Sequence, residues 1–259
     1  MGELLRVEDL QIAYGNHQAV KGAGFVLNQG EIAALVGESG SGKTTVVRAI
    51  DGLLPGEASI TGGRFYLEGR DLTKLSSGEW GKIHGKEISM IFQNPESSLS
   101  PLQTLDKQFV ENVRAHKKEP KDSILKRAEK ILEDMRFPEP GKILRAYPFE
   151  LSGGMCQRAA IALAIMNQPR LLLADEPTSA LDVAAQNMTI QTLLELRRQY
   201  GTAILLVTHN IGVAYKMADY IGVMYRGRLL EWGTKEEVLF HPREDYTRRL
   251  IQAIPHLAD

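Results

Sequence analysis

One stretch decides the fold of this chain: Gly37-Glu38-Ser39-Gly40-Ser41-Gly42-Lys43-Thr44. It fits the pattern G-x-x-x-x-G-K-[ST] of a phosphate-binding loop. Residues 31–36, ahead of it, form a short apolar run typical of a buried strand, and residues 45–50, after it, are typical of a helix. Because strand, loop and helix follow in the order that the motif needs, a glycine-rich turn that matches by chance is the weaker interpretation.

The residue types in this loop suit a triphosphate. Glycine lets the backbone turn closely enough for successive N–H groups to face the phosphates, and the positive end of the following helix adds to them. Lys43 can reach the β- and γ-phosphates, and the Thr44 hydroxyl can ligate Mg²⁺. The loop and the adjacent Thr45 therefore predict a nucleotide site.

A second buried strand, residues 170–176, ends in two carboxylates, Asp175 and Glu176. Asp175 is suited to bind Mg²⁺, and Glu176 can act as a base on the attacking water. Two acids at a strand end are usually only solvated, but after a phosphate loop they are the expected second half of a nucleotide site. A later strand, residues 203–208, ends at His209, which is either a γ-phosphate ligand or an ordinary structural histidine.

Two other features have both a functional and an ordinary interpretation. Tyr14, at the end of a predicted strand over residues 4–14, can stack on an adenine ring or be a half-buried tyrosine. Ser152-Gly153-Gly154 opens an apolar helix and is either a second anion site or a simple N-cap.

Hydrophobic patterns predict the remaining elements. Residues 57–69 predict a hairpin with Gly62-Gly63 near its turn, and residues 100–168 are dominated by helical patterns. The other strands that we expect are residues 19–27, 88–92 and a hairpin over 220–232. The other helices that we expect are residues 104–118, 121–135, 184–199 and 246–254. Lysines and arginines in the first two of these helices predict a solvated mixed face or a surface near anionic lipid.

Composition sets broad limits. The 259 residues are 43% hydrophobic, which is enough for a sizeable core, and the formal net charge of -1 gives no electrostatic case for nucleic acid. The one cysteine, Cys156, rules out an intrachain disulfide and suits a reducing compartment. No apolar run approaches the ~18 residues of a spanning helix. We therefore expect a cytoplasmic protein that reaches a membrane only through a partner.

Together these motifs resemble the ATP-binding subunits of ABC transporters. Residues 37–44 match the Walker A loop of that family, residues 171–175 its Walker B strand, and Glu176 its catalytic base. Residues 151–157 match its signature motif, with Met155 where glutamine is common. The resemblance extends to the adenine-stacking aromatic, the Q-loop glutamine, the D-loop and the switch histidine, matched by Tyr14, Gln93, residues 179–182 and His209.

The resemblance implies a role for each matched residue. The implied catalytic residues are Glu176, His209 and Gln93. Those implied to contact the nucleotide, besides the loop, are Tyr14, Ser152, Gly153, Gly154 and Asp182. Those implied to hold Mg²⁺ are Thr44, Gln93 and Asp175. ATP and Mg²⁺ are thus the expected cofactors.

The family's fold is α/β: a RecA-like P-loop NTPase core with an antiparallel β subdomain and an inserted α-helical subdomain. We expect the core in residues 1–94 and 166–240, the helical subdomain in 95–165 and a short C-terminal tail in 241–259. Ser152 would then lie on the insert, far from Lys43 of the same chain. It would complete the site of a second ATPase subunit, either a related chain or a second copy of this one.

A narrower resemblance, carried by residues 93–101, 147–155 and 180–183, is to importer ATPases for dipeptides, oligopeptides and nickel. The tail lacks the cysteines of longer peptide-importer members, which makes it similar to the nickel or metallophore members. The resemblance implies ATP-driven uptake of nickel, a metal chelate or peptides. It also implies two transmembrane permeases, a periplasmic or extracellular substrate-binding protein, and a place at the cytoplasmic face of the cell membrane.

Two rival classes remain. A non-transport ABC ATPase of genome maintenance or translation usually has a long coiled-coil insertion or two tandem copies, and this sequence shows neither a heptad run nor an internal repeat. A P-loop kinase leaves the signature motif and His209 without a role.

Overall fold

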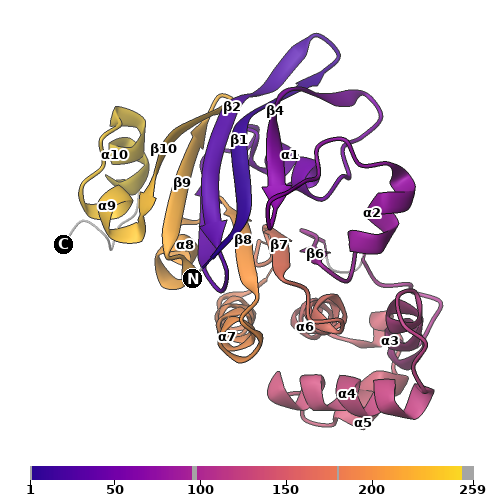
Figure 1. Ribbon diagram of the computed structural model, residues 1–259. Helices are drawn as coiled ribbons and strands as arrows, with labels where there is room; N and C mark the ends of the chain where they lie inside the picture. Colours follow the sequence, from indigo (N-terminus) through magenta and orange to yellow (C-terminus); the bar gives the residue numbers. More distant parts are fainter. Residues whose placement is uncertain (1, 95–97, 180, 253–259) are drawn as a thin grey trace.

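The computed structural model describes residues 2–94, 98–179 and 181–252 (Figure 1). Several sequence predictions include residues outside these ranges. Residues 95–97 belong to the predicted helical subdomain and to the narrow family resemblance, and residue 180 belongs to the D-loop match and to that same resemblance. Residue 1 belongs to the predicted core, and residues beyond 252 belong to the last predicted helix and the C-terminal tail.

The strands form two sheets (Figure 1). The larger sheet is parallel except for its edge strand β10, and it has the order β10 (Arg228–Thr234), β9 (Tyr220–Tyr225), β3 (Ile32–Val36), β8 (Ala203–Thr208), β7 (Leu171–Asp175), β6 (Ile88–Ile91). The smaller sheet is antiparallel and has the order β2 (His17–Asn28), β1 (Glu3–Tyr14), β4 (Ala58–Leu67), β5 (Arg70–Asp71).

Helices lie around the larger sheet, and the segment from α3 to α5, in the lower part of Figure 1, forms a separate helical layer. The first five are α1 (Lys43–Ile50), α2 (Ser77–Ile83), α3 (Leu105–Arg114), α4 (Lys121–Asp134) and α5 (Pro140–Arg145). A 3₁₀ turn (Pro148–Glu150) precedes α6 (Gly153–Ile165), α7 (Val183–Tyr200), α8 (Ile211–Met217), α9 (Lys235–Phe240) and α10 (Asp245–Gln252). No helix within the described part of the chain combines the length and the apolar character needed to cross a membrane.

The central strand β3 shows why the larger sheet is covered on both faces. All five of its residues are buried. Ala33 and Leu35 pack with α1 and the smaller sheet, whereas Ile32, Ala34 and Val36 pack in the cluster that includes α6 to α8. A strand that alternates between two apolar layers reads as a continuous hydrophobic run. This burial fixes β3, and so fixes where the loop after it begins.

The predicted hairpin around Gly62-Gly63 is wrong. Strand β4 runs unbroken through both glycines, and the chain turns later, at Glu68-Gly69. Gly63 has φ 76°, and a Cβ there would collide with the backbone of Asp9 on β1, where the β1–β4 register shifts. The glycine pair therefore marks a β-bulge, which needs the same backbone freedom as a turn.

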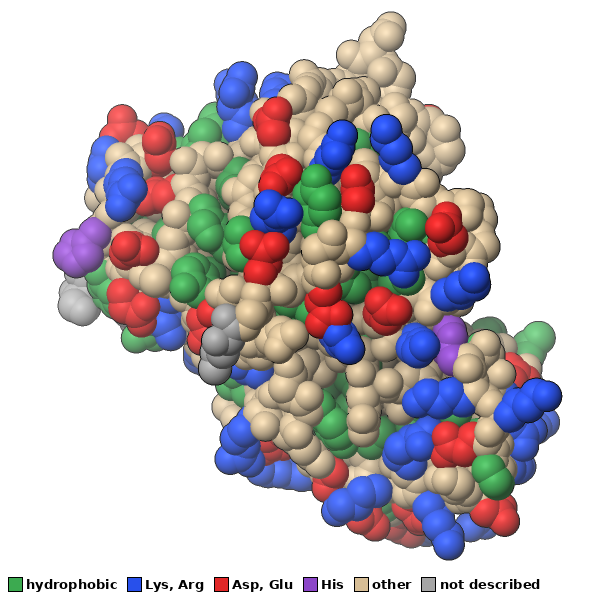
Figure 2. Space-filling model, in the orientation of Figure 1, with side chains coloured by type: hydrophobic (Ala, Val, Ile, Leu, Met, Phe, Trp, Pro, Cys, Tyr) green, Lys and Arg blue, Asp and Glu red, His purple; other side chains and the backbone are tan. Residues whose placement is uncertain are grey.

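The helical layer contains α3, α4 and α5. The helix predicted over 104–118 ends at Arg114, and the short α5, with Pro140 at its first position, was not predicted. Figure 2 shows Lys and Arg side chains gathered over this part of the molecule. Several pair with acids: Lys121 with Asp106, Arg127 with Glu119, and Lys130 with Asp134. The basic residues thus belong to a mixed, solvated face.

Candidate nucleotide site

The phosphate loop joins β3 to α1 and depends on two glycines. Gly37 has φ 147° and Gly42 has φ 103°, in the range that favours glycine. A Cβ on Gly37 would collide with the carbonyl oxygen of Met224 on β9, and one on Gly42 would lie 2.8 Å from that of Ala19 on β2. Only glycine therefore lets the loop pass this close to both strands.

Lys43 points back into the loop that precedes it. Its side chain is buried, and Nζ donates to the carbonyl oxygens of Gly37 (2.8 Å) and Glu38 (2.7 Å) and to Oγ of Ser41 (3.3 Å). Burial lowers the pKa of Lys43, and the nearby carboxylates, Glu176 first, oppose that shift. The loop therefore encloses a cation whose present partners are neutral oxygens, and a phosphate can replace them.

Thr44 and Asp175 bring α1 and β7 together. The Thr44 hydroxyl donates to Oδ1 of Asp175 at 2.9 Å. Burial raises the pKa of Asp175, and the hydrogen bond from Thr44 opposes the shift. A hydroxyl and a carboxylate are hard oxygen donors, which fit Mg²⁺. Since the described residues contain no cluster of three or more His, Cys, Asp or Glu, most other ligands of such an ion would come from nucleotide and water.

Glu176 connects the ends of three neighbouring strands. Its Oε2 accepts a hydrogen bond from Nε2 of Gln93 (3.4 Å), which follows β6, and lies 3.1 Å from Nδ1 of His209, which follows β8. Its own N–H donates to Val207 at 2.9 Å, and its φ of 47° is unusual for a residue with a side chain. Such a conformation costs about 1–2 kcal/mol. The surrounding sheet therefore holds this carboxylate in a defined place.

These groups surround one pocket of about 950 Å³. Its lining residues are Ala19, Ser39, Gly40, Gly42, Lys43, Thr44, Thr45, Gln93, Asn94, Glu176, Ser179 and His209. Three of them, Ala19, Asn94 and Ser179, are not among the site residues that the sequence predicts. Asn94 follows the predicted Q-loop glutamine, and Ser179 is the first residue of the D-loop match, so both positions carried a usable sequence signal. Ala19 lies on β2 and is brought here by tertiary packing alone.

Some predicted site residues support the pocket without lining it. Gly37, Glu38 and Ser41 bind the Lys43 ammonium from behind. Tyr14 is half-buried at the end of β1, and its hydroxyl lies 3.4 Å from Oγ1 of Thr45. Its ring is therefore beside the pocket, on the side of the smaller sheet.

The signature residues and Asp182 do not line this pocket. Ser152 caps α6 by accepting a hydrogen bond from the Met155 N–H at 3.4 Å, and Asp182 caps α7 by accepting one from the Ala185 N–H at 2.8 Å. A Cβ on Gly154 would lie 3.0 Å from Cβ of Ala185, so the two helices begin side by side. Ser152, Gly153 and Asp182 are exposed. We call the exposed surface formed by Ser152, Gly153 and Asp182 the signature surface; it is open to solvent and separate from the Lys43 pocket.

A phosphate loop with acids and a histidine beyond the carboxyl ends of a parallel sheet defines a P-loop nucleotide-binding protein. The family model described as ABC transporter matches residues 20–179. The chain belongs to this ABC transporter family, and it is an ATPase of the ABC type with the α/β fold that the motifs predicted.

Two curated relatives cover nearly the whole chain. The oligopeptide transport ATP-binding protein OppD of Bacillus subtilis (strain 168) is 42% identical over 98% of this chain and 72% of its own length. The dipeptide transport ATP-binding protein DppD of the same organism is 40% identical over 99% of this chain and 78% of its own length. Both names agree with the peptide-transport part of the narrower resemblance, and neither names nickel.

Two solved structures share the fold. The cbiO1 protein of Clostridium perfringens, part of the ABC transporter complex cbiONQ, has a TM-score of 0.80 and 27% identity, over 93% of this chain and 92% of its own. A dimeric post-hydrolysis state of the ATP-binding cassette MJ0796, bound to ADP and Pi, has a TM-score of 0.76 and 28% identity, over 89% and 98% of the two chains.

Proposed function

We propose that this chain is the ATP-hydrolysing subunit of an ABC importer for peptides and works at the cytoplasmic face of the cell membrane. The observation that carries the hydrolytic part is that Glu176 contacts both Gln93 and His209 and that all three line the phosphate-loop pocket. The identity of 40–42% to oligopeptide and dipeptide transport ATP-binding proteins supports the cargo.

The residues divide the chemistry among them. Lys43 exchanges the carbonyl oxygens of Gly37 and Glu38 for phosphate oxygens, so its charge is already in place when ATP arrives. Glu176 takes the proton of the attacking water, and His209 holds the γ-phosphate beside it.

Thr44, Asp175 and Gln93 would hold Mg²⁺, which supplies positive charge against the phosphate oxygens when bound. The oxygens of Thr44 and Asp175 already lie 2.9 Å apart. The Tyr14 ring, next to Thr45, would stack on the adenine.

A second ATPase subunit completes the site in this proposal. Ser152, Gly153 and Asp182 are exposed and do not line the pocket that holds Lys43 of their own chain. Hydrogen bonds to a charged phosphate contribute about 1.5–3 kcal/mol each, and about 5.5 kcal/mol shifts an equilibrium from 1:99 to 99:1. Two to four contacts from the signature surface of the partner subunit to the γ-phosphate are therefore enough to close a dimer. The related MJ0796 cassette has been solved as a dimer.

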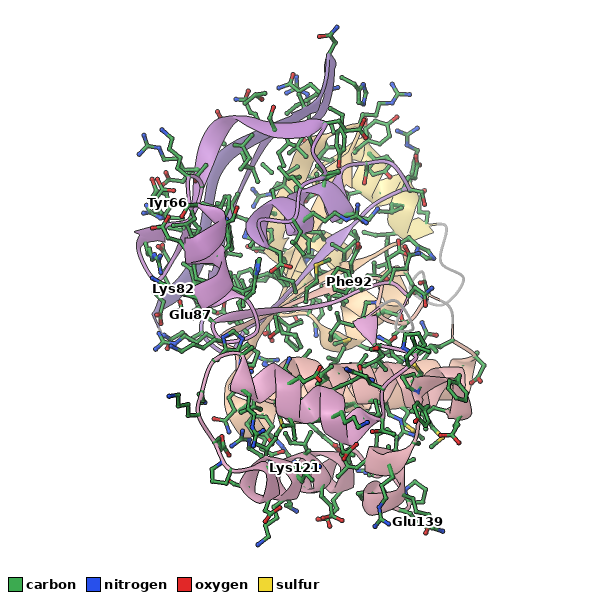
Figure 3. All side chains as sticks on the ribbon, turned by 90° about the vertical axis from the view of Figure 1, so that its right-hand side faces the viewer. Tyr66, Lys82, Glu87, Phe92, Lys121 and Glu139 are labelled. Carbon is green, nitrogen blue, oxygen red and sulfur yellow. The ribbon has the colours of Figure 1, made fainter. Side chains whose placement is uncertain are left out.

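We place the permease contact at the hollow beside Gln93. This hollow of about 290 Å³ lies between β6 and α6, and Phe92, Ile88 and Leu163 are among its apolar lining residues. In Figure 3, Phe92 lies on the side of the helices that faces the sheet, and Lys121, on α4, lies far below it. Residues 1–94 and 166–240 would move as one body and residues 95–165 as another. Contact between Gln93 and the γ-phosphate would then change the position of the helical subdomain, and this movement would reach the permease.

Uptake assays test cargo and transport together. A strain that lacks this gene is complemented with wild type or with Glu176→Gln, and entry of a radiolabelled oligopeptide and of radiolabelled nickel is measured. We expect peptide uptake with wild type only. Nickel uptake with no peptide uptake would replace the peptide cargo by nickel. If wild type restores uptake of neither peptide nor nickel, and no permease or substrate-binding protein copurifies with it, a non-transport ABC ATPase would be favoured.

A further inference from the structure

The C-terminal helix α10 contacts the phosphate loop through one tyrosine. The N–H of Glu38 donates to the hydroxyl oxygen of Tyr246 at 3.3 Å, across 208 positions of sequence. Tyr246 is only 8% exposed, and its ring lies 4.2 Å, centroid to centroid, from that of Tyr225 at the end of β9. None of the sequence motifs that define the nucleotide site includes this residue.

The position of Tyr246 is set by the core. Tyr246 and Ile251 belong to the larger hydrophobic cluster. The Glu231 carboxylate on β10 accepts hydrogen bonds from the backbone N–H groups of Arg243 (2.9 Å) and Glu244 (3.4 Å), just before α10 begins. The helix is therefore fixed at its start by β10 and along its length by packing.

Glu38 is held at both ends of its backbone. Its N–H donates to Tyr246, and its carbonyl oxygen accepts from Nζ of Lys43 at 2.7 Å. Three residues further along the loop, the carbonyl oxygen of Ser41 accepts from the Gly227 N–H at 3.0 Å. When Lys43 turns to a phosphate, the Glu38 carbonyl oxygen keeps its hydrogen bond from the Ser41 N–H (3.2 Å), and the Tyr246 hydroxyl still accepts from the Glu38 N–H.

We propose that Tyr246 is a positioning residue for the phosphate loop. Its hydroxyl keeps the Glu38 peptide in the conformation that the nucleotide-bound loop needs, so less order has to be created when ATP binds. This inference rests on the proposed nucleotide site and adds to it a residue from the C-terminal helix. It predicts that the tyrosine hydroxyl affects nucleotide affinity and leaves the chemical step unchanged.

The test compares Tyr246→Phe with the matched control Tyr225→Phe, both made in the full chain. Each variant keeps its aromatic ring, but only the first removes the hydroxyl that contacts the loop. We expect Tyr246→Phe to weaken ATP binding about two- to tenfold by calorimetry, the effect of one hydrogen bond. In the assembled complex KM for ATP rises and kcat is retained. Tyr225→Phe matches wild type in both assays, and all three proteins melt at similar temperatures.

A second measurement needs no nucleotide. Hydrogen exchange in the peptide that covers residues 36–47 should be faster in Tyr246→Phe than in wild type and Tyr225→Phe. Equal exchange and equal ATP affinity in all three proteins would overturn the proposal, as would equal losses in both variants. If wild type itself does not bind ATP, the nucleotide site is refuted, and the exchange comparison still decides whether Tyr246 orders the loop.

Discussion

Replacing Glu176 by glutamine tests the catalytic assignment with the smallest change of shape. The Glu176 carboxylate lies 3.1 Å from His209 and accepts a hydrogen bond from Gln93 at 3.4 Å. A glutamine amide has the same size and keeps one oxygen acceptor, so the fold and the pocket should survive. It has no basicity, however, and cannot take a proton from water.

The expected magnitude follows from that loss. A positioned general base contributes about 10²–10⁴-fold, or about 2.7–5.5 kcal/mol of activation free energy. ATP binding should not weaken. Of the carboxylates near the Lys43 ammonium, Glu176 has the largest electrostatic effect on it, and both residues line the same pocket. Removing its charge reduces repulsion of the γ-phosphate, so ATP affinity stays equal or rises.

The assay is steady-state ATP hydrolysis by the assembled complex, with ATP affinity measured in parallel. His209→Gln is the control, because it keeps the base and removes a γ-phosphate contact. A kcat for Glu176→Gln within threefold of wild type would refute the assignment. Severe loss of ATP binding would instead give Glu176 a structural role.

Three further predictions, one of them with a matched control variant, test the loop and the core. Lys43→Ala should weaken ATP binding at least about tenfold by calorimetry, because it removes a charged donor; undiminished affinity would count against the loop as a phosphate site. Gly37→Ala should lower the free energy of unfolding in urea by about 1–3 kcal/mol, because its Cβ meets the Met224 carbonyl, and Gly40→Ala, which has open space, should cost less. Burial raises the pKa of Asp51 to about 7, so the folded protein favours the neutral acid and loses stability as pH rises from about 4 through 7. The stability of wild type relative to Asp51→Asn should therefore fall by about 2–3 kcal/mol between pH 5 and 8. A constant difference would contradict the raised pKa of Asp51.

The parts of the site that could be predicted are those whose functional residues lie close together in the sequence. Residues 37–44 carry their glycines, lysine and threonine in one run, and Asp175 and Glu176 are adjacent at the end of an apolar strand. The strand over residues 203–208 left two interpretations of His209 open, and only the family resemblance indicated that it belongs to the site. The contacts of Glu176 with both Gln93 and His209 follow from strand order, in which β7 lies between β6 and β8.

The parts that could not be predicted depend on contacts between distant segments. Ala19 reaches the pocket because β2 passes the loop at Gly42, and Tyr246 reaches Glu38 because α10 packs beside β9. Neither residue belongs to a sequence motif of the nucleotide site. The Gly62-Gly63 error has another cause: a turn and a bulge both favour glycine, and only the pairing with β1 distinguishes them.

We propose that one nucleotide is held by two subunits, through Lys43 of one and Ser152 of the other. The most direct measurement is light scattering of ATP-loaded Glu176→Gln protein, alone or with the ATPase that copurifies with it, with and without Ser152→Arg. We predict that Glu176→Gln forms a dimer with ATP, and that adding Ser152→Arg leaves a monomer with unchanged ATP affinity. Full ATP-driven dimerisation of the Ser152→Arg protein would contradict the account.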